Sequence, residues 1–561
     1  MIAGPLRFSA WHCGRLSRAA LDGLLRSGDT QKGRLRTCLA GVAVLGATVA
    51  FAWEAPGRVI IGEERALPVH IEDEVEHSLS AQQFIAHGKR VFGAIFTEED
   101  GAGRPLSKGT GRQLTDPSRP LSGLRMFNRI SGPDANSCAG CHNMPYGISG
   151  GGGDFVTNVF VQGHRFDFVT FDAADTVPTR GSLDEAGAPV SLQTVGNFRA
   201  TTGLFGAGFI EMLARQMTAD LQRIRDSVAL GQTAELWTKG IFFGRLTRRA
   251  DATWDTTGVE GLPRQSVIAP TPLDKPSLII RPWHQAGSVV SLREFSNNAF
   301  NHHHGMQPAE RFGRDTDLDG DGFTNELTRG DITAVSLYQA TIAVPGRVIP
   351  RVPEVERAVL NGEHQFAMIG CSRCHVPALP LERKGWVYSE PNPYNPLTNH
   401  RAGEGPTVSV DLTSDDLPPP RLKPLPGELN TLFVPLFSDL KLHDITDPAD
   451  PAEAEAIDMN WFVWSPKFLD GNRRFLTKRL WGAANEPPFF HHGLFTTLRQ
   501  SILAHHGEAL TERLAFQRLS EYDRSCIIEF LKSLQVLPPG ITALVVDEQF
   551  RPREWPPAEA W

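Results

Sequence analysis

Apolar side chains recur at helical spacing in several separated segments of this chain, at residues 81–96, 210–228, 292–300, 331–343, 355–368, 498–505 and 522–534. Before the third segment, Ser291 and Glu294 match the S-x-x-E pattern that caps a helix N-terminus. Two short runs of β-forming residues, 155–161 and 166–171, predict a hairpin. The pattern therefore predicts a mainly α chain with minor β hairpins.

Glycine and proline separate these segments. The 561 residues include 53 Gly and 41 Pro without a repeating period, which predicts long loops between modest helices. Three prolines lie within residues 345–353 and mark a boundary between two halves of the chain. In each half, a predicted helix is followed by a tight loop that contains cysteine. We therefore expect two domains, 53–344 and 345–561, after a separate segment 1–52.

The segment 1–52 differs from the rest of the chain in charge. It carries seven Lys and Arg against two Asp and Glu, so the remainder has a net charge of −13, although the whole chain has −8. Basic residues precede an apolar run, 38–53, in which Ala50-Phe51-Ala52 fits a signal peptidase site. We expect a cleaved signal peptide and a periplasmic body. An uncleaved anchor with membrane contact and a buried N-terminal helix are the alternatives.

Overall composition narrows the class of protein. Charged residues make up 21% of the chain and its mean hydropathy is −0.22, values that argue against disorder and against a polytopic membrane protein. The chain outside segment 1–52 is acidic, which disfavours nucleic acid as a partner. The same charge suits a small, basic electron-donor protein as a partner.

Two pentapeptides dominate the candidate chemistry: Cys138-Ala139-Gly140-Cys141-His142 and Cys371-Ser372-Arg373-Cys374-His375. The C-x-x-C-H string places two thiols where they can bind both vinyl groups of one haem, and its histidine can then bind the iron. A zinc ribbon requires its cysteine pairs much closer together, and a thioredoxin-like pair requires a βαβ setting that the pattern does not show. We therefore expect two covalently bound haem c groups, with His142 and His375 as proximal ligands, in two cytochrome c-like domains.

The function of each haem depends on the sixth ligand of its iron. Leu498, Ser501, Ile502 and His505 share one face of a predicted helix, whereas His506 is rotated about 100° away. His505 is therefore the expected distal ligand of the second haem. The alternative is that His505 is an ordinary buried histidine without a metal. Of the remaining cysteines, Cys526 lies on an apolar helix face and is expected to be a core thiol.

Residues 315–326 match the D-x-D-x-D-G-x5-E calcium loop. The candidate ligands are the carboxylates of Asp315, Asp317, Asp319, Asp321 and Glu326. A solvated loop without a cation is the alternative. Upstream, His302, His303 and His304 form a triplet, which is either a surface loop or part of a distal haem pocket.

With both pentapeptides, the segment Phe490-His491-His492-Gly493 and the helix beginning at Thr497-Leu498, the sequence resembles the bacterial di-haem cytochrome c peroxidase superfamily, and within it the di-haem oxidoreductase family once labelled thiol oxidoreductases. The likeness covers most of residues 85–537. The resemblance implies a reactive first haem and an electron-transfer second haem.

The resemblance also assigns two histidines. In these peroxidases the second iron's distal ligand follows the histidine of the Phe-His-Asp-Gly segment by fourteen residues, which gives His505 when counted from His491. The loop that carries the acid–base glutamate in relatives aligns with His303-His304-Gly305, so His303 is the candidate catalytic residue.

Together these observations predict a peroxidase-like oxidoreductase that takes electrons from a small redox protein, such as a cytochrome or a cupredoxin, and reacts with peroxide or O2. In this scheme peroxide binds at the first iron opposite His142, His303 moves the proton, and the second haem supplies an electron. A di-haem oxygenase or protein-modifying oxidase is one alternative. A non-enzymatic electron carrier with both irons closed is the other.

Overall fold

The computed structural model describes residues 61–73, 75–102, 135, 137–159, 196–317, 321–450, 453–455, 458, 460–461, 467 and 470–557. The chain divides into the units Met1–Pro56 and Gly57–Trp561, and only the second contains described residues. The predicted leader 1–52 therefore lies outside the described residues. Within the second unit, the boundary between residues 344 and 345 stays a prediction, and we use it to name a first and a second half.

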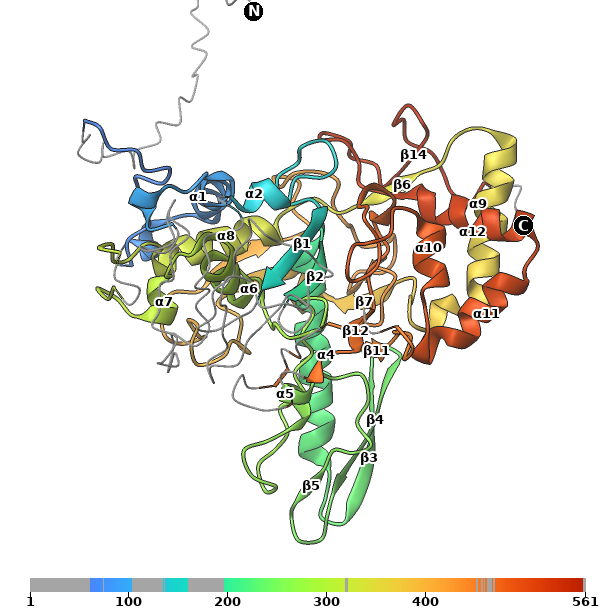
Figure 1. Ribbon diagram of the computed structural model, residues 1–561, viewed down its shortest axis with the longest axis horizontal. Coiled ribbons are helices and arrows are strands. Elements are labelled where there is room, and N and C mark those ends of the chain that lie inside the picture. The colour runs from blue at the N-terminus through green and yellow to red at the C-terminus, as the bar shows by residue number, and fades with distance from the viewer. Residues whose placement is uncertain are drawn as a thin grey trace, which may run out of the picture. The chain divides into compact units, whose positions relative to one another are not determined.

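The helices are mostly short, as Figure 1 shows. The α-helices are α1 (Ala81–Gly93), α2 (Cys138–Cys141), α4 (Ala207–Ser227), α5 (Arg264–Val267), α6 (Leu292–Ala299), α7 (Ala309–Phe312), α8 (Arg329–Ala340), α9 (Pro353–Met368), α10 (Leu498–Leu503), α11 (Leu510–Arg518) and α12 (Glu521–Ser533). One π-helical turn, η6, spans Phe300–His304. Single 3-10 turns are η1 (Glu76–Ser78), η2 (Glu98–Asp100), η7 (Cys371–Arg373), η8 (Arg383–Trp386), η11 (Ala483–Asn485) and η12 (Gly507–Ala509).

The strands form several sheets of two or three strands. They are β1 (Gly153–Val159), β2 (Gly196–Thr201), β3 (Gln232–Thr238), β4 (Ile241–Arg248), β5 (Trp254–Asp255), β6 (Gly346–Val348), β7 (Leu379–Glu382), β8 (Val387–Glu390), β9 (Val408–Asp411), β10 (Thr431–Val434), β11 (Leu442–Asp444), β12 (Arg474–Leu476), β13 (Leu534–Gln535) and β14 (Val545–Val546). The sheet orders are β1-β2, β3-β4-β5, β13-β6-β14, β10-β7, β8-β9 and β11-β12.

The prediction of a mainly α fold was wrong, because the structure is 34% helical and 15% strand. Much of the strand content pairs segments that are far apart in the sequence, such as β7 with β10 and β11 with β12. Such three- or four-residue strands are too short to show an alternating pattern of their own. The predicted hairpin also differs: β1 pairs with β2, and its expected partner at 166–171 lies outside the described residues.

The predicted helices are present with small shifts at their ends. Ser291 caps α6 by accepting a hydrogen bond from the backbone N–H of Glu294, as the sequence pattern predicted. The Glu294 carboxylate in turn accepts a hydrogen bond from the backbone N–H of Val290. In an ideal capping box it would accept from the N–H of the cap residue, Ser291, one position later. Within the described part of the chain, every helix is too short or too polar to cross a membrane.

A similar helix pair recurs in both halves, α1 on α8 and α9 on α12 (Figure 1). Each pair meets at a glycine that admits no side chain. A Cβ atom on Gly88 would lie 2.0 Å from the carbonyl oxygen of Ala334, and one on Gly362 would lie 1.9 Å from that of Cys526. The second contact also confirms Cys526 as a buried core residue. Gly88 and Gly362 therefore allow the backbones to approach closely.

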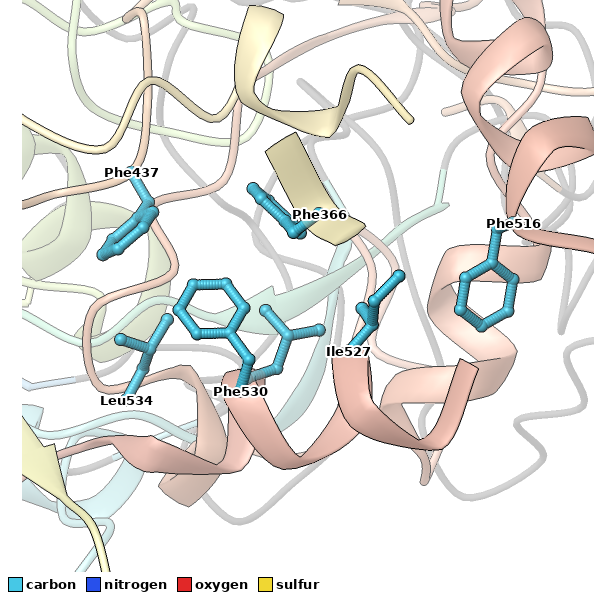
Figure 2. Close-up of a cluster of buried hydrophobic side chains, with 7 residues drawn as sticks. Phe366, Phe437, Phe516, Ile527, Phe530 and Leu534 are labelled. Carbon is cyan, nitrogen blue, oxygen red and sulfur yellow. The ribbon is translucent and has the colours of Figure 1, made fainter. Parts of the chain in front are cut away.

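An aromatic residue lies four positions after each glycine. The ring of Phe92 is 5.4 Å from that of Tyr338, and the ring of Phe366 is 5.3 Å from that of Phe530. Figure 2 shows Phe366 and Phe530 pointing toward one another within a core cluster of buried residues: Phe366, Phe437, Phe516, Ile527, Phe530, Leu531 and Leu534. The helix pairs thus place Phe92 and Phe366 in corresponding positions.

A buried ionic network joins the halves. Arg293 on α6 is fully buried and contacts Glu310 at 2.8 Å and Glu390, at the end of β8, at 3.1 Å. Because a buried charge without partners is strongly destabilising, this network fixes α6 against the second half. The π-helical turn η6 follows α6 directly, so the same network supports the segment that contains His303.

Candidate haem sites

The second pentapeptide opens onto a large, mostly apolar cavity with an empty volume of about 1580 Å³, part of which is open to solvent. Cys371, Cys374, His375 and the predicted distal ligand His505 all line it. Apolar side chains complete the wall, including Phe366, Leu480, Leu498, Ile502 and Leu531. The structure therefore brings together the residues that the sequence assigned to the second haem.

His375 and His505 face each other in this cavity. Their ring centroids lie 6.5 Å apart and their planes are inclined by 60°. The Nδ1 atom of His375 donates to the carbonyl oxygen of Phe437 at 3.2 Å, and that of His505 donates to the carbonyl oxygen of Ser501 at 2.7 Å. A hydrogen bond at Nδ1 fixes the ring and leaves Nε2 as the ligand atom.

This spacing fits two axial ligands of one iron. A nitrogen ligand typically lies about 2 Å from its metal, and the imidazole centroid lies about 1 Å further, so two imidazoles on opposite sides of one ion have centroids about 6 Å apart. Phe437 has a positive φ of 54°, an uncommon conformation that sets the direction of its carbonyl group. The residues present therefore fit a haem ligated by two histidines.

The first pentapeptide lines a smaller cavity, with an empty volume of about 820 Å³. Cys138, Cys141 and His142 all contribute to its wall, and Nδ1 of His142 donates to the carbonyl oxygen of Gly151 at 3.0 Å. The ring of Phe92 lies 6.1 Å from that of His142, which is also the distance between Phe366 and His375. The two proximal histidines thus have corresponding surroundings.

Burial keeps the proximal histidines neutral. It lowers the pKa of His142 to about 4 and that of His375 to about 4, and it also lowers the pKa of His505. Since an imidazole binds a metal only in its neutral form, these residues are available as ligands at neutral pH.

The histidine triplet lies in the π-helical turn η6, a type of distortion frequent at functional sites. His304 is buried: its Nδ1 donates to the carbonyl oxygen of Ala135 at 2.7 Å, and its Nε2 lies 3.6 Å from Sγ of Cys138. His303 lines the first cavity and is only partly buried. The structure thus places the candidate catalytic residue His303 in the same cavity as His142. His304, predicted only as a member of the triplet, contacts Ala135 and Cys138 beside the first pentapeptide.

His443 is a further histidine that lines the second cavity. Its Nε2 contacts Asp439 at 2.9 Å and its Nδ1 contacts Glu508 at 2.7 Å. Burial alone would lower the pKa of His443, but its hydrogen bonds, above all the one to Asp439, outweigh burial and raise the pKa to about 11. Among the described residues, His443, Asp439 and Cys374 form a group whose possible metal-ligand atoms all lie within 4.8 Å of one another. Because Cys374 belongs to the haem motif, this group belongs to the second haem site.

The histidines of the Phe490-His491-His492-Gly493 segment have different surroundings. His491 lines the second cavity and stacks on Phe475 with ring centroids 3.5 Å apart. Nδ1 of His492 instead accepts a hydrogen bond from the backbone N–H of Leu494 at 3.0 Å. His491 and His505 thus both line the second cavity, and His505 is the one whose ring lies 6.5 Å from that of His375.

The structure describes the candidate calcium loop except for Leu318, Asp319 and Gly320. The Asp317 carboxylate accepts from the backbone N–H groups of Asp321 and Gly322, and the Asp321 carboxylate from that of Phe323. Glu326 is buried and accepts from the N–H of Gln307 at 2.7 Å. Asp315 and Asn325 bond each other reciprocally. The described carboxylates thus organise the loop itself, and calcium binding stays a prediction.

Comparison with known proteins gives one family match. Residues 428–534 match the family described as "Di-haem oxidoreductase, putative peroxidase", the family that the sequence resemblance named. No curated protein matches the chain. A solved structure of hydrazine synthase from Kuenenia stuttgartiensis, pressurised with xenon, aligns at 16% identity over 40% of this chain and 65% of its own, with a TM-score of 0.21. The alignment spans less than two thirds of that chain, and so low a TM-score does not establish a shared fold.

The matched region 428–534 includes Phe437, His443 and His505, and therefore much of the second cavity wall. The cavities, the paired histidines and the family match together support a di-haem oxidoreductase.

Proposed function

We propose that this protein is a di-haem c-type cytochrome with peroxidase-like activity, in which the first site is reactive and the second transfers electrons. The facing pair His375 and His505 carries the proposal, because two imidazoles at 6.5 Å fit an iron closed to substrate. The first cavity instead combines a proximal histidine, His142, with a partly buried histidine, His303, that is suited to proton transfer.

Haem iron, when bound, supplies one-electron redox chemistry and, at an open coordination position, a place for a small oxidant. The protein residues supply orientation and proton transfer. His142 lines the cavity with its Nδ1 fixed by the carbonyl oxygen of Gly151, and His304 contacts Ala135 and Cys138. His303 then holds or moves the proton that cleavage of a peroxide O–O bond requires.

Covalent attachment is part of the proposal, since both pentapeptides place two cysteines beside a proximal histidine on the wall of a cavity. Covalent haem attachment takes place outside the cytoplasmic membrane, so a periplasmic location agrees with the leader pattern. The net charge of −13 outside that leader supports a small basic redox protein as the electron donor.

Calcium at residues 315–326 remains a proposal from the loop pattern, with Asp315, Asp317, Asp319, Asp321 and Glu326 as candidate ligands. The buried carboxylate of Glu326, at the twelfth position of the pattern, gives it support. A structural cation there would fix the chain immediately before α8.

Electron paramagnetic resonance of the purified ferric holoprotein tests the proposed function. We expect one low-spin signal from the His375–His505 site and one high-spin signal, or a signal that becomes high-spin on partial reduction, from the first site. Two low-spin signals that neither calcium nor partial reduction alters would instead indicate an electron carrier. Turnover of peroxide with reduced cytochrome, compared with turnover of O2 with a hydrophobic olefin, then separates a peroxidase from an oxygenase.

A further inference from the structure

The two cavities share one residue among those that the structure describes. Gln285 lies in the loop between α5 and α6, is buried, and contributes to the walls of both the first and the second cavity. Gln285 therefore lies between the two candidate haem sites and borders both cavities.

Hydrogen bonds connect Gln285 to each wall. Its side-chain Nε2 donates to the carbonyl oxygen of Ala200 at 3.1 Å and to Oγ1 of Thr202 at 3.2 Å, and both of these residues line the first cavity. Its backbone carbonyl oxygen accepts from the N–H of Leu476 at 2.8 Å, and Leu476 lines the second cavity. A continuous hydrogen-bonded path thus runs from one cavity wall to the other through Gln285.

A second link runs beside the first. The backbone N–H of Ala200 donates to the carbonyl oxygen of His491 at 2.9 Å, and His491 lines the second cavity while stacked on Phe475. Gln285 and His491 therefore converge on Ala200 from the side of the second cavity. The wall between the cavities is therefore a buried hydrogen-bonded network, and such a network holds the groups on its two sides in fixed positions.

We propose that Gln285 is a positioning residue that couples the two haem sites for electron transfer. The inference rests on the proposed function in so far as both cavities hold haem. In the step concerned, one electron leaves the reduced second site and arrives at the oxidised first site, so one iron is oxidised as the other is reduced. The step transfers no proton and requires no further reactant.

The test uses the full holoprotein and the variant Gln285→Met, which keeps the size of the side chain but removes its amide. The matched control is Gln222→Met, because the side-chain amide of Gln222 also donates to a backbone carbonyl oxygen, that of Ser277 at 2.8 Å, and Gln222 lines neither cavity. One-electron reduction by pulse radiolysis, followed optically, gives the rate at which the electron equilibrates between the haems. Haem content and both reduction potentials are measured on every variant.

We expect Gln285→Met to slow equilibration by on the order of tenfold, because it breaks the buried hydrogen-bonded link between the cavity walls, with both reduction potentials unchanged. Gln222→Met should keep the wild-type rate. Thr202→Val, which removes a single acceptor, should slow it by a smaller factor and serves as the test if Gln285→Met does not assemble. A wild-type rate in Gln285→Met would overturn the inference, and so would a wild-type rate in Thr202→Val if only that variant assembles. Equal slowing in Gln222→Met would also overturn it.

The measurement uses no peroxide, so its result is independent of peroxidase activity. A protein without peroxidase activity whose electron equilibration is slowed by Gln285→Met would refute the proposed function and support the inference. A peroxide-active protein whose electron equilibration is not slowed by Gln285→Met would support the proposed function and refute the inference.

Discussion

His505 lies across the second cavity from His375, with ring centroids 6.5 Å apart and each Nδ1 bonded to a backbone carbonyl oxygen. Neither hydrogen bond depends on the other ring, so each imidazole is held in place independently. This arrangement identifies the pair of residues whose replacement should change the second haem most specifically.

Replacing His505 with Met should keep the second haem but remove its bis-histidine spectrum. Because methionine ligation raises the reduction potential, the potential of this haem should rise by on the order of 100 mV, within the range of ~0.8 V that axial ligands cover. Spectroelectrochemical titration measures the shift. His506→Met is the control, since His506 contacts Asp447 at 3.5 Å instead. An unchanged spectrum in His505→Met would exclude His505 as the ligand.

Replacing His303 with Ala should slow peroxide cleavage by about a hundredfold or more, the usual contribution of a general acid–base group, without loss of haem. Stopped-flow spectroscopy with excess peroxide gives the rate. The exposed His364 on α9 provides a control variant, His364→Ala, which should react at the wild-type rate. Equal rates in His303→Ala and wild type would assign proton transfer to another group.

Replacing Gly88 with Ala should destabilise the first helix pair by about 2 kcal/mol, because its Cβ atom would overlap the backbone of Ala334. A Cβ atom on Gly93, in the same helix, would meet only open space, so Gly93→Ala should be nearly neutral. Urea unfolding of both variants measures the difference. Equal stabilities would show that α1 and α8 do not require this close contact.

The Asp331 carboxylate links His70 and His87, at 2.6 and 2.7 Å. Burial alone would raise the pKa of Asp331, but the two histidines outweigh it and hold this pKa well below the usual value. For His70, burial alone would lower the pKa, but the charge and the hydrogen bond of Asp331 outweigh burial. The pKa of His70 is therefore raised. Asp331→Asn should therefore lower the free energy of unfolding by about 3 kcal/mol at pH 6.

The pH dependence of that effect has a definite sign. The contribution of Asp331 is present above the ordinary aspartate pKa of 3.8 and is lost as the pH falls through its lowered value. The contribution of His70 is complete below the ordinary histidine pKa of 6.5 and is lost as the pH rises through its raised value. Wild type and Asp331→Asn should thus differ most between these two pH values, whereas the exposed variant Glu354→Gln should match wild type throughout.

Replacing Glu326 with Gln should weaken calcium binding about tenfold, because it removes one carboxylate charge from the loop. Calorimetric titration of chelator-treated protein measures the affinity, and the exposed variant Glu98→Gln is the control. Absence of binding heat up to millimolar calcium in the wild type would show that the loop is organised by its own hydrogen bonds alone.

The features predicted correctly from sequence were those set by local pattern. The helix that begins at Leu498 and the cap at Ser291 follow from side-chain spacing within one segment. The helix α10 ends at Leu503, however, so His505 lines the cavity from the chain just beyond the helix and not from its inner face. The haem motifs were recognisable because their cysteines and histidine are contiguous.

Features that depend on distant segments could not be predicted. His443 acquires its role from Asp439 on one side and from Glu508, far along the chain, on the other. The different roles of His303 and His304 depend on the π-helical turn η6, whose extra residue changes the directions of neighbouring side chains. The small sheets likewise depend on non-local pairing, which is why the fold was predicted as mainly α.

Intact-protein mass spectrometry tests the central claim most directly. The chain is expressed with a haem c maturation system, denatured and washed with acidified acetone, so that only covalently attached haem remains. The account predicts a mass increase of two haem groups, reduced to one in Cys138→Ser/Cys141→Ser and in Cys371→Ser/Cys374→Ser. A wild-type chain that emerges colourless and without added mass would contradict it.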